Sequence, residues 1–94
     1  MHLVNRGLLA KFASEHAEVR GPLAAWEAEV RAAEWETPAN VKARYPSASF
    51  LKSNRVVFNL KGQKYRVDVR VDYVARVVFV HRIGTHAEYN TWTY

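Results

Sequence analysis

Hydrophobic residues recur with two different periods along this chain, and the change of period divides it into two halves. Over residues 5–16 and 22–35 the apolar side chains return every three or four positions, which predicts two helices that each bury one face. Thr37 and Pro38 are typical of a helix start and predict a third helix over residues 37–44. Beyond residue 55 the period falls to two, which indicates β-strands.

The predicted strands have different surroundings. Residues 55–60 and 64–73 alternate between apolar and polar side chains, so we expect one face of each strand to be core and the other to be charged and hydrated. Residues 77–83 are apolar almost throughout, which favours a central strand that is covered on both faces. A short edge strand is expected over residues 1–4, and Asn5 is the expected N-cap of the first helix.

A two-residue hairpin turn is predicted at positions 61–62, because the glycine at position 62 readily takes a positive φ angle. Such a turn would pair Asn59 with Lys64 and Val57 with Arg66 across the hairpin. It would also gather four basic side chains near one end of the sheet: Lys52, Lys61, Lys64 and Arg66.

Positive charge is concentrated in the strand-rich half. The chain carries a net charge of +5, and residues 1–47 hold equal numbers of acidic and basic side chains. Residues 48–94 hold eight Lys or Arg against three Asp or Glu, and we interpret Asp68 and Asp72 as cross-strand charge partners rather than catalysts. A basic sheet favours a polyanion such as nucleic acid as partner, although lysines also serve solubility and edge protection.

The last segment is predicted to be a short helix. Thr85 and Glu88 match a capping box, which explains both residues structurally. The helix would place His86 and Tyr89 on one face, three positions apart. A histidine exchanges protons near neutral pH, so His86 is the candidate acid or base, and Arg82 at the end of the preceding strand is a candidate phosphate clamp.

Composition narrows the classes of protein that this chain can be. Its 94 residues are expected to form one domain over residues 1–94, and 49% hydrophobic residues are enough for a core. The absence of cysteine excludes disulfides and thiolate metal sites and fits a reducing cytoplasm. No apolar run at the N-terminus resembles a signal peptide or a membrane span. Motifs for zinc proteases, phosphate-binding glycine loops and dinucleotide sites are missing as well.

An ordered set of segments resembles one family along nearly the whole chain. The set comprises residues 1–4, Leu23-Ala-Ala-Trp26, Ala33-Glu-Trp35, Thr37-Pro-Ala-Asn-Val-Lys42, Pro46-Ser-Ala48, Arg55-Val-Val-Phe-Asn59, Lys61-Gly62, Lys64-Tyr-Arg66 and Gly84-Thr-His-Ala-Glu-Tyr89. With it the chain resembles the HigB-type toxins of type II toxin–antitoxin modules, in the branch related to the RelE superfamily. His2 and Asn90 depart from that pattern, where Arg and Asp respectively are usual.

The resemblance implies a RelE-like α+β fold, with N-terminal helices followed by an antiparallel sheet and a short C-terminal helical segment. It implies an endoribonuclease that cleaves translated messages in the ribosomal A site without a metal or an organic cofactor. In that chemistry Arg66 and Arg82 would stabilise charge on the phosphate, His86 would be general acid or base, and Tyr89 would assist or orient it. The RNA- or ribosome-binding residues would be Lys52, Arg55, Asn59, Lys61 and Lys64.

The implied partners are mRNA on the ribosome and a HigA-like antitoxin with a helix-turn-helix domain. Operator DNA would be reached only through that antitoxin, and no membrane is involved. Three alternatives remain open from the sequence: a non-catalytic RNA-binding module of the ribosome, a protein–protein adaptor, and an RNase that acts on free RNA.

Overall fold

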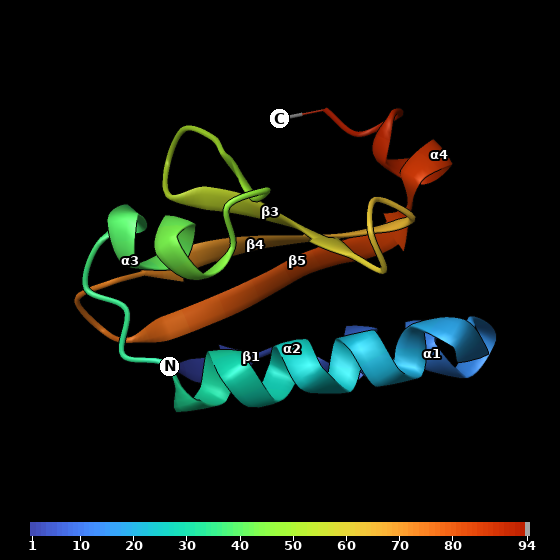
Figure 1. Cartoon of the computed structure of the whole chain (residues 1–94), viewed down its shortest axis with the longest axis horizontal. Coiled ribbons are helices and arrows are strands. Elements are labelled where there is room, and N and C mark those ends of the chain that lie inside the picture. The colour runs from blue at the N-terminus through green and yellow to red at the C-terminus, as the bar shows by residue number, and fades with distance from the viewer. Residues whose placement is uncertain (94) are drawn as a thin grey trace.

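A five-stranded sheet lies over two N-terminal helices in the computed structural model, which describes residues 1–93 (Figure 1). Its elements are, in chain order, β1 (His2–Val4), α1 (Arg6–Glu15), the 3₁₀ turn η1 (Ala17–Val19), α2 (Arg20–Ala32), α3 (Pro38–Arg44), β2 (Ser49–Phe50), β3 (Arg55–Leu60), β4 (Tyr65–Asp72), β5 (Val77–Thr85) and α4 (His86–Tyr89). The α+β architecture expected from the sequence is confirmed.

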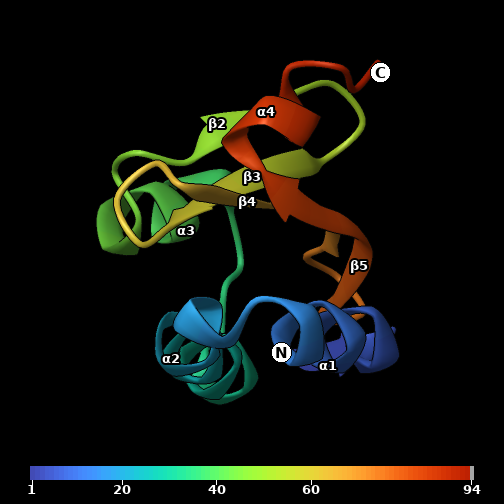
Figure 2. The ribbon, with the colours of Figure 1, turned by 90° about the vertical axis from the view of Figure 1, so that its right-hand side faces the viewer.

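The sheet has the strand order β1-β5-β4-β3-β2. Only β1 runs parallel to its neighbour, while the other strand pairs are antiparallel. The expected edge strand at the N-terminus is therefore confirmed. β5 is an interior strand, as expected, but the middle of the sheet is β4, and the expected cover of β5 on both faces is incomplete because His81 is exposed. Viewed from the side, α1 and α2 cover one face of the sheet, and α4 lies on the opposite side (Figure 2).

The core lies between the sheet and the helices. The predicted alternation of apolar and polar residues turns one face of each strand toward it. Alternate residues of β3, β4 and β5 point into it, and Phe58 at its centre is fully buried. Three aromatic rings surround Phe58: Trp26 at 5.4 Å, Trp35 at 6.1 Å and Tyr45 at 5.1 Å between ring centroids. Burial of this aromatic cluster holds α2, the following loop and α3 against β3.

The second helix differs from the prediction at both ends. It begins at Arg20 and ends at Ala32, whereas the apolar spacing predicted a helix over 22–35. Ala33 adopts an extended conformation, with φ −72° and ψ 152°, and this break turns Trp35 toward Phe58. A tertiary contact therefore overrides the local helical period.

Asn5 occupies the predicted N-cap position of α1 but does not cap it. Its backbone is left-handed, with φ 74°, and its side chain makes no capping hydrogen bond. The Nδ2 atom instead donates to the carbonyl oxygen of Val80 at 3.1 Å. Asn5 thus fastens the β1–α1 junction to β5.

A hairpin between β2 and β3 was not predicted, because residues 45–54 lack the glycine-containing pairs that mark tight turns. Ser53 and Asn54 both take positive φ angles, 59° and 60°, as a type I′ turn requires. The amide of Arg55 closes the turn by donating to the carbonyl of Lys52 at 3.3 Å.

The turn between β3 and β4 is longer than predicted. Leu60 pairs with Tyr65, so the loop holds the four residues 61–64 instead of two. The predicted pairing of Asn59 with Lys64 and of Val57 with Arg66 is therefore wrong, and Asn59 lies opposite Arg66. Because the register differs by two residues, each side chain still points to its predicted face.

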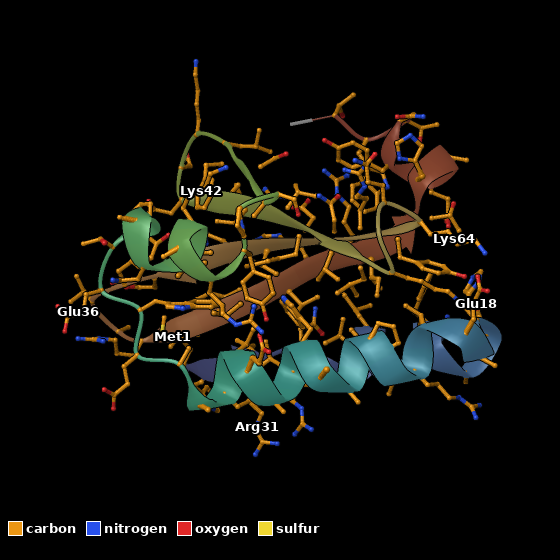
Figure 3. All side chains as sticks on the ribbon, viewed as in Figure 1. Met1, Glu18, Arg31, Glu36, Lys42 and Lys64 are labelled. Atoms are coloured by element: carbon orange, nitrogen blue, oxygen red, sulfur yellow. The ribbon has the colours of Figure 1, made fainter. Side chains whose placement is uncertain are left out.

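The longer loop brings its lysines to Glu18 in η1. The ammonium groups of Lys61 and Lys64 lie 3.2 Å and 3.0 Å from the Glu18 carboxylate, and the Tyr65 hydroxyl donates to it. Figure 3 shows Glu18 and Lys64 together at one end of the molecule. The hydrogen bond from Tyr65, with the two lysines, lowers the pKa of Glu18 to about 2, and the same bond raises the pKa of Tyr65.

The role of the aromatic core is tested by making the same substitution at a buried and at an exposed phenylalanine. Phe58→Ala is expected to lower the free energy of unfolding by about 3–5 kcal/mol, since Phe58 is fully buried. Phe50→Ala, at a side chain that is 37% exposed, is expected to cost about 1 kcal/mol or less. Urea unfolding measures both, and equal losses would contradict the described core.

The Glu18 cluster predicts a pH-dependent contribution to stability. Because the folded state lowers the Glu18 pKa from 4.5 to about 2, the stabilisation is complete above pH 4.5 and is lost as the pH falls toward 2. Glu18→Gln is therefore expected to lower the urea midpoint at neutral pH and to match the wild type near pH 2. A difference that stays constant across this pH range would contradict the cluster.

Candidate functional site

The sheet face opposite α1 and α2 carries arginines from three strands, and we call it the arginine face: Arg55 from β3, Arg66 and Arg70 from β4, and Arg82 from β5. Nitrogen-bearing side chains are visible between this face and α4 in Figure 3. The sequence predicted this face to be hydrated, but Arg66 is only 8% exposed and Asp68 is 0% exposed. The prediction was wrong because the C-terminal residues fold back over the face.

One extra residue in β5 places Arg82 on this face. Asp68 pairs with Arg82 while the next residue, Val69, pairs with Val80, so His81 is the additional residue of a β-bulge. Without the bulge, alternation from Val80 would turn Arg82 toward the core. His81 itself is exposed, and desolvation together with the nearby Arg55 lowers its pKa.

The Asp68 carboxylate holds two of the arginines. Arg55 reaches it from β3 with Nη2 at 2.5 Å and Nε at 3.2 Å, and Arg82 reaches it from β5 with Nε at 2.8 Å. A buried carboxylate is stable only when it is paired and hydrogen-bonded, as here. The interpretation of Asp68 as a cross-strand charge partner is confirmed. For Asp72 it was wrong, because Oδ1 of Asp72 accepts from the amides of the following turn.

Arg66, His86 and Tyr89 form a second cluster beside this pair. Nη2 of Arg66 lies 2.9 Å from Nδ1 of His86, and the Arg66 guanidinium lies 4.6 Å from the centroid of the Tyr89 ring. The rings of His86 and Tyr89 are 6.4 Å apart, so the two residues share a face of α4 as predicted. Residues 20 positions apart in sequence thus meet at one point of the surface.

The Arg66 contact fixes the tautomer of His86. A guanidinium has only donors, so Nδ1 of His86 accepts this hydrogen bond through its lone pair. In the neutral ring the proton then lies on Nε2. His86 is exposed, which leaves the ring accessible to a ligand.

The predicted capping box holds α4 in place, as expected. The Thr85 amide donates to the Glu88 carboxylate at 2.9 Å, and the Glu88 amide donates to the Thr85 hydroxyl at 3.2 Å. The His86 amide donates to the Lys64 carbonyl at 3.0 Å, which ties the helix to the β3–β4 loop. Both Thr85 and Glu88 therefore have a structural role.

The segment after α4 turns back over the arginine face (Figure 1). The Arg82 guanidinium lies 4.6 Å from the Trp92 ring, and its Nη2 donates to the Thr93 carbonyl at 3.0 Å. Gly84 makes this close approach possible, because a Cβ atom there would lie 2.9 Å from Cζ2 of Trp92. Trp92 also contacts Tyr89 edge to face, with 5.5 Å between ring centroids.

The predicted gathering of lysines is only partly observed. Lys61 and Lys64 follow the end of β3 that lies near Arg66, whereas Lys52 precedes its other end, so Lys52 does not join them and that part of the prediction was wrong. Asn59 lies opposite Arg66 and donates to the Ser47 carbonyl at 2.9 Å.

Three residues of this face were not singled out by sequence reasoning as site residues: Asp68, Arg70 and Trp92. The spacing of Trp92, three positions after Tyr89, is the signal that was available for it. Within residues 1–93 no three His, Cys, Asp or Glu side chains cluster as metal ligands would. No helix in that part of the chain has the length and apolar character needed to cross a membrane.

Comparison with known proteins identifies the family. Residues 19–92 match the family model HigB_toxin, described as the RelE-like toxic component of a toxin–antitoxin system. The mRNA interferase toxin HigB of Escherichia coli K12 is 26% identical over 95 residues, which cover 99% of this chain and 91% of that protein. The mRNA interferases HigB of Escherichia coli O157:H7 and of Shigella flexneri are similar to the same extent.

A toxic component acts together with an antitoxin, so an antitoxin is the implied partner. The chain belongs to the HigB family of RelE-like toxins of toxin–antitoxin systems.

Proposed function

We propose that this protein is an endoribonuclease that cleaves mRNA on the ribosome without a metal ion. The Arg66–His86–Tyr89 cluster carries the proposal, because it joins a guanidinium, a group suited to binding phosphate, to the exposed imidazole of His86, which can accept a proton. The similar HigB proteins are named mRNA interferases, which supports the same substrate class.

Cleavage follows from the chemistry of RNA itself. The 2′-hydroxyl attacks the adjacent phosphorus, the bond from phosphorus to the 5′-oxygen breaks, and a 2′,3′-cyclic phosphate remains. The 2′-hydroxyl loses its proton to a base, and the leaving 5′-oxygen gains one. Negative charge builds on the phosphate oxygens between these events, so a fixed cation beside them accelerates the reaction.

We assign the base to His86. Its Nδ1 lone pair is directed at Arg66 in the free protein. When the guanidinium turns to an incoming phosphate, Nδ1 is released and takes the 2′-hydroxyl proton. Tyr89 lies on the Arg66 guanidinium and limits how far it moves, and water supplies the proton of the 5′-oxygen.

Arg82 supplies the second cation. Asp68 orients its Nε edge, and the Thr93 carbonyl occupies its Nη2 donor. A phosphate that binds at this donor replaces the carbonyl of Thr93. Arg82 therefore joins the reaction when RNA displaces the Thr93 carbonyl from its guanidinium.

The remaining basic and polar residues serve binding. Lys61 and Lys64 stand at the end of the sheet that holds Arg66, and Arg55 shares Asp68 with Arg82. Asn59 is next to Arg66, and within residues 1–93 neither its buried Oδ1 atom nor the buried Nε atom of Arg66 has a hydrogen-bond partner. Lys52, at the far end of β3, is assigned to ribosomal RNA rather than to the message.

The antitoxin is proposed to be HigA-like, with a helix-turn-helix domain through which the complex reaches operator DNA. The ribosome is proposed to supply part of the site, since a chain of 94 residues builds only a shallow groove for RNA.

Cleavage is expected to depend on His86 and not on His81. His81 is the matched control because it is also an exposed histidine and lies outside the Arg66–His86–Tyr89 cluster. His86→Ala and Arg66→Ala are each expected to reduce cleavage at least 100-fold, the usual scale for a general base or a charge-stabilising donor. His81→Ala is expected to retain activity. The measurement is 5′-end mapping on translated and untranslated copies of one message, in cells without the antitoxin.

Cleavage of the untranslated copy would contradict ribosome dependence but leave the site standing. Growth arrest with intact messages would favour a non-catalytic module that binds RNA or the ribosome. Cleavage that is indifferent to both substitutions would contradict the assignment of the site.

Asp68 is expected to act on cleavage through Arg82. Asp68→Asn removes the charge that orients two arginines and is expected to lower the free energy of unfolding by about 3 kcal/mol. It is also expected to lower cleavage per folded molecule, and by less when Arg82 is already Ala, because the two residues then share one effect. Cleavage is measured alongside urea unfolding. If Asp68→Asn lowers cleavage equally in the wild type and in the Arg82→Ala variant, Asp68 has a structural role only.

A further inference from the structure

Three arginines of the arginine face each stack on an aromatic ring. Arg66 lies 4.6 Å from the Tyr89 ring, and Arg82 lies 4.6 Å from the Trp92 ring, and both belong to the site described above. The third stack lies beyond that site, where the Arg70 guanidinium is 4.5 Å from the centroid of Phe79. Neither the proposed chemistry nor the folding of the core uses this third pair.

Arg70 points to the same side of the sheet as Arg66. Its neighbours on β4, Val69 and Val71, are fully buried in the core, so alternation turns Arg70 to the opposite face. It is partly exposed, and its partner across β4 and β5 is Phe79. Stacking on the ring restrains the guanidinium through its face and does not use its N–H donors.

The electrostatic surroundings of Arg70 favour an anion. Arg70 lies directly opposite Arg55 on β3, an arrangement of like charges that destabilises a sheet. Asp68 compensates Arg55. Within residues 1–93 no carboxylate lies within ion-pair distance of Arg70, and Asp72 directs Oδ1 to the backbone of its own turn.

The distances along β4 suit a polynucleotide. Arg66 and Arg70 are four residues apart on one strand, which separates their backbones by about 13 Å. That length corresponds to about four stacked nucleotides at 3.4 Å each, and to fewer in an extended strand. Asp68, with Arg82 opposite it, lies between them, and Arg55 reaches Asp68 from its position opposite Arg70, so the two arginines outweigh the single carboxylate and the path stays positively charged.

We propose that the arginine face is a track for single-stranded RNA and that Arg70 and Phe79 form its distal subsite. The phosphate backbone passes from Arg66 over Arg82 to Arg70, and Phe79 anchors the last guanidinium and presents its edge to a base. Alternating cations and aromatic rings are the features by which proteins hold single strands without reading their sequence. This inference rests on the proposed function and extends it beyond the scissile phosphate.

Binding of short and long RNA tests the track. The probes are fluorescent 2′-O-methyl RNAs of about three and about nine nucleotides, on either side of the length that spans Arg66 to Arg70. They resist cleavage because the attacking hydroxyl is blocked. Fluorescence anisotropy at low ionic strength then gives the affinity of the full-length protein and of each variant for both lengths.

Arg70→Gln is expected to weaken binding of the long RNA roughly fivefold and to leave the short RNA unchanged, with the salt slope reduced by about 0.7 for one lost phosphate contact. Arg66→Gln is expected to weaken both. Arg31→Gln is the matched control and is expected to change neither, because Arg31 projects from α2 away from the sheet (Figure 3).

Other outcomes separate this inference from the proposed function. If Arg66→Gln weakens binding while Arg70→Gln matches the wild type at both lengths, the distal subsite is refuted and the proposed function stands. If the wild type binds neither RNA, or no variant differs from it, RNA binding by the whole face is refuted. A second measurement is cosedimentation of the protein with ribosomes that carry no message. If Arg70→Gln weakens this cosedimentation but leaves the affinity for both RNAs unchanged, Arg70 contacts ribosomal RNA and the track is refuted.

Discussion

The arrangement of the candidate site depends on one buried carboxylate. Asp68 is 0% exposed, and burying its charge without partners would cost several kcal/mol. Arg55 and Arg82 compensate it from the two neighbouring strands. The two arginines in turn depend on Asp68, because its negative charge lets two guanidinium groups lie close together on one sheet face. A positively charged surface with fixed geometry follows from that one group.

The β-bulge and the C-terminal segment serve the same arrangement. The extra residue at His81 brings Arg82 to Asp68, and the missing side chain at Gly84 lets Trp92 cover Arg82. The capping box at Thr85 then directs His86 toward Arg66. Each of these features is a local departure from regular β-structure, and together they bring a proton acceptor to the arginines.

The two faces of the sheet differ in what they bury. Apolar residues and the aromatic cluster around Phe58 fill the face against α1 and α2. The opposite face buries Asp68 and Arg66 and leaves its other arginines partly exposed, and aromatic rings stack on the guanidinium groups and hold them in place.

The sequence by itself determined the order of the helices and of every strand except β2, the core face of the predicted strands, the capping box and the adjacency of His86 to Tyr89, because periodicity and capping are local properties. Only the tertiary structure decided which of these residues meet. The turn length at positions 61–64 follows from contacts with Glu18, the end of α2 follows from the packing of Trp35 on Phe58, and the bulge has no local signal. The pairing of Arg66 with His86, and the burial of Asp68, depend on strands that are distant in sequence, so no local pattern encodes them.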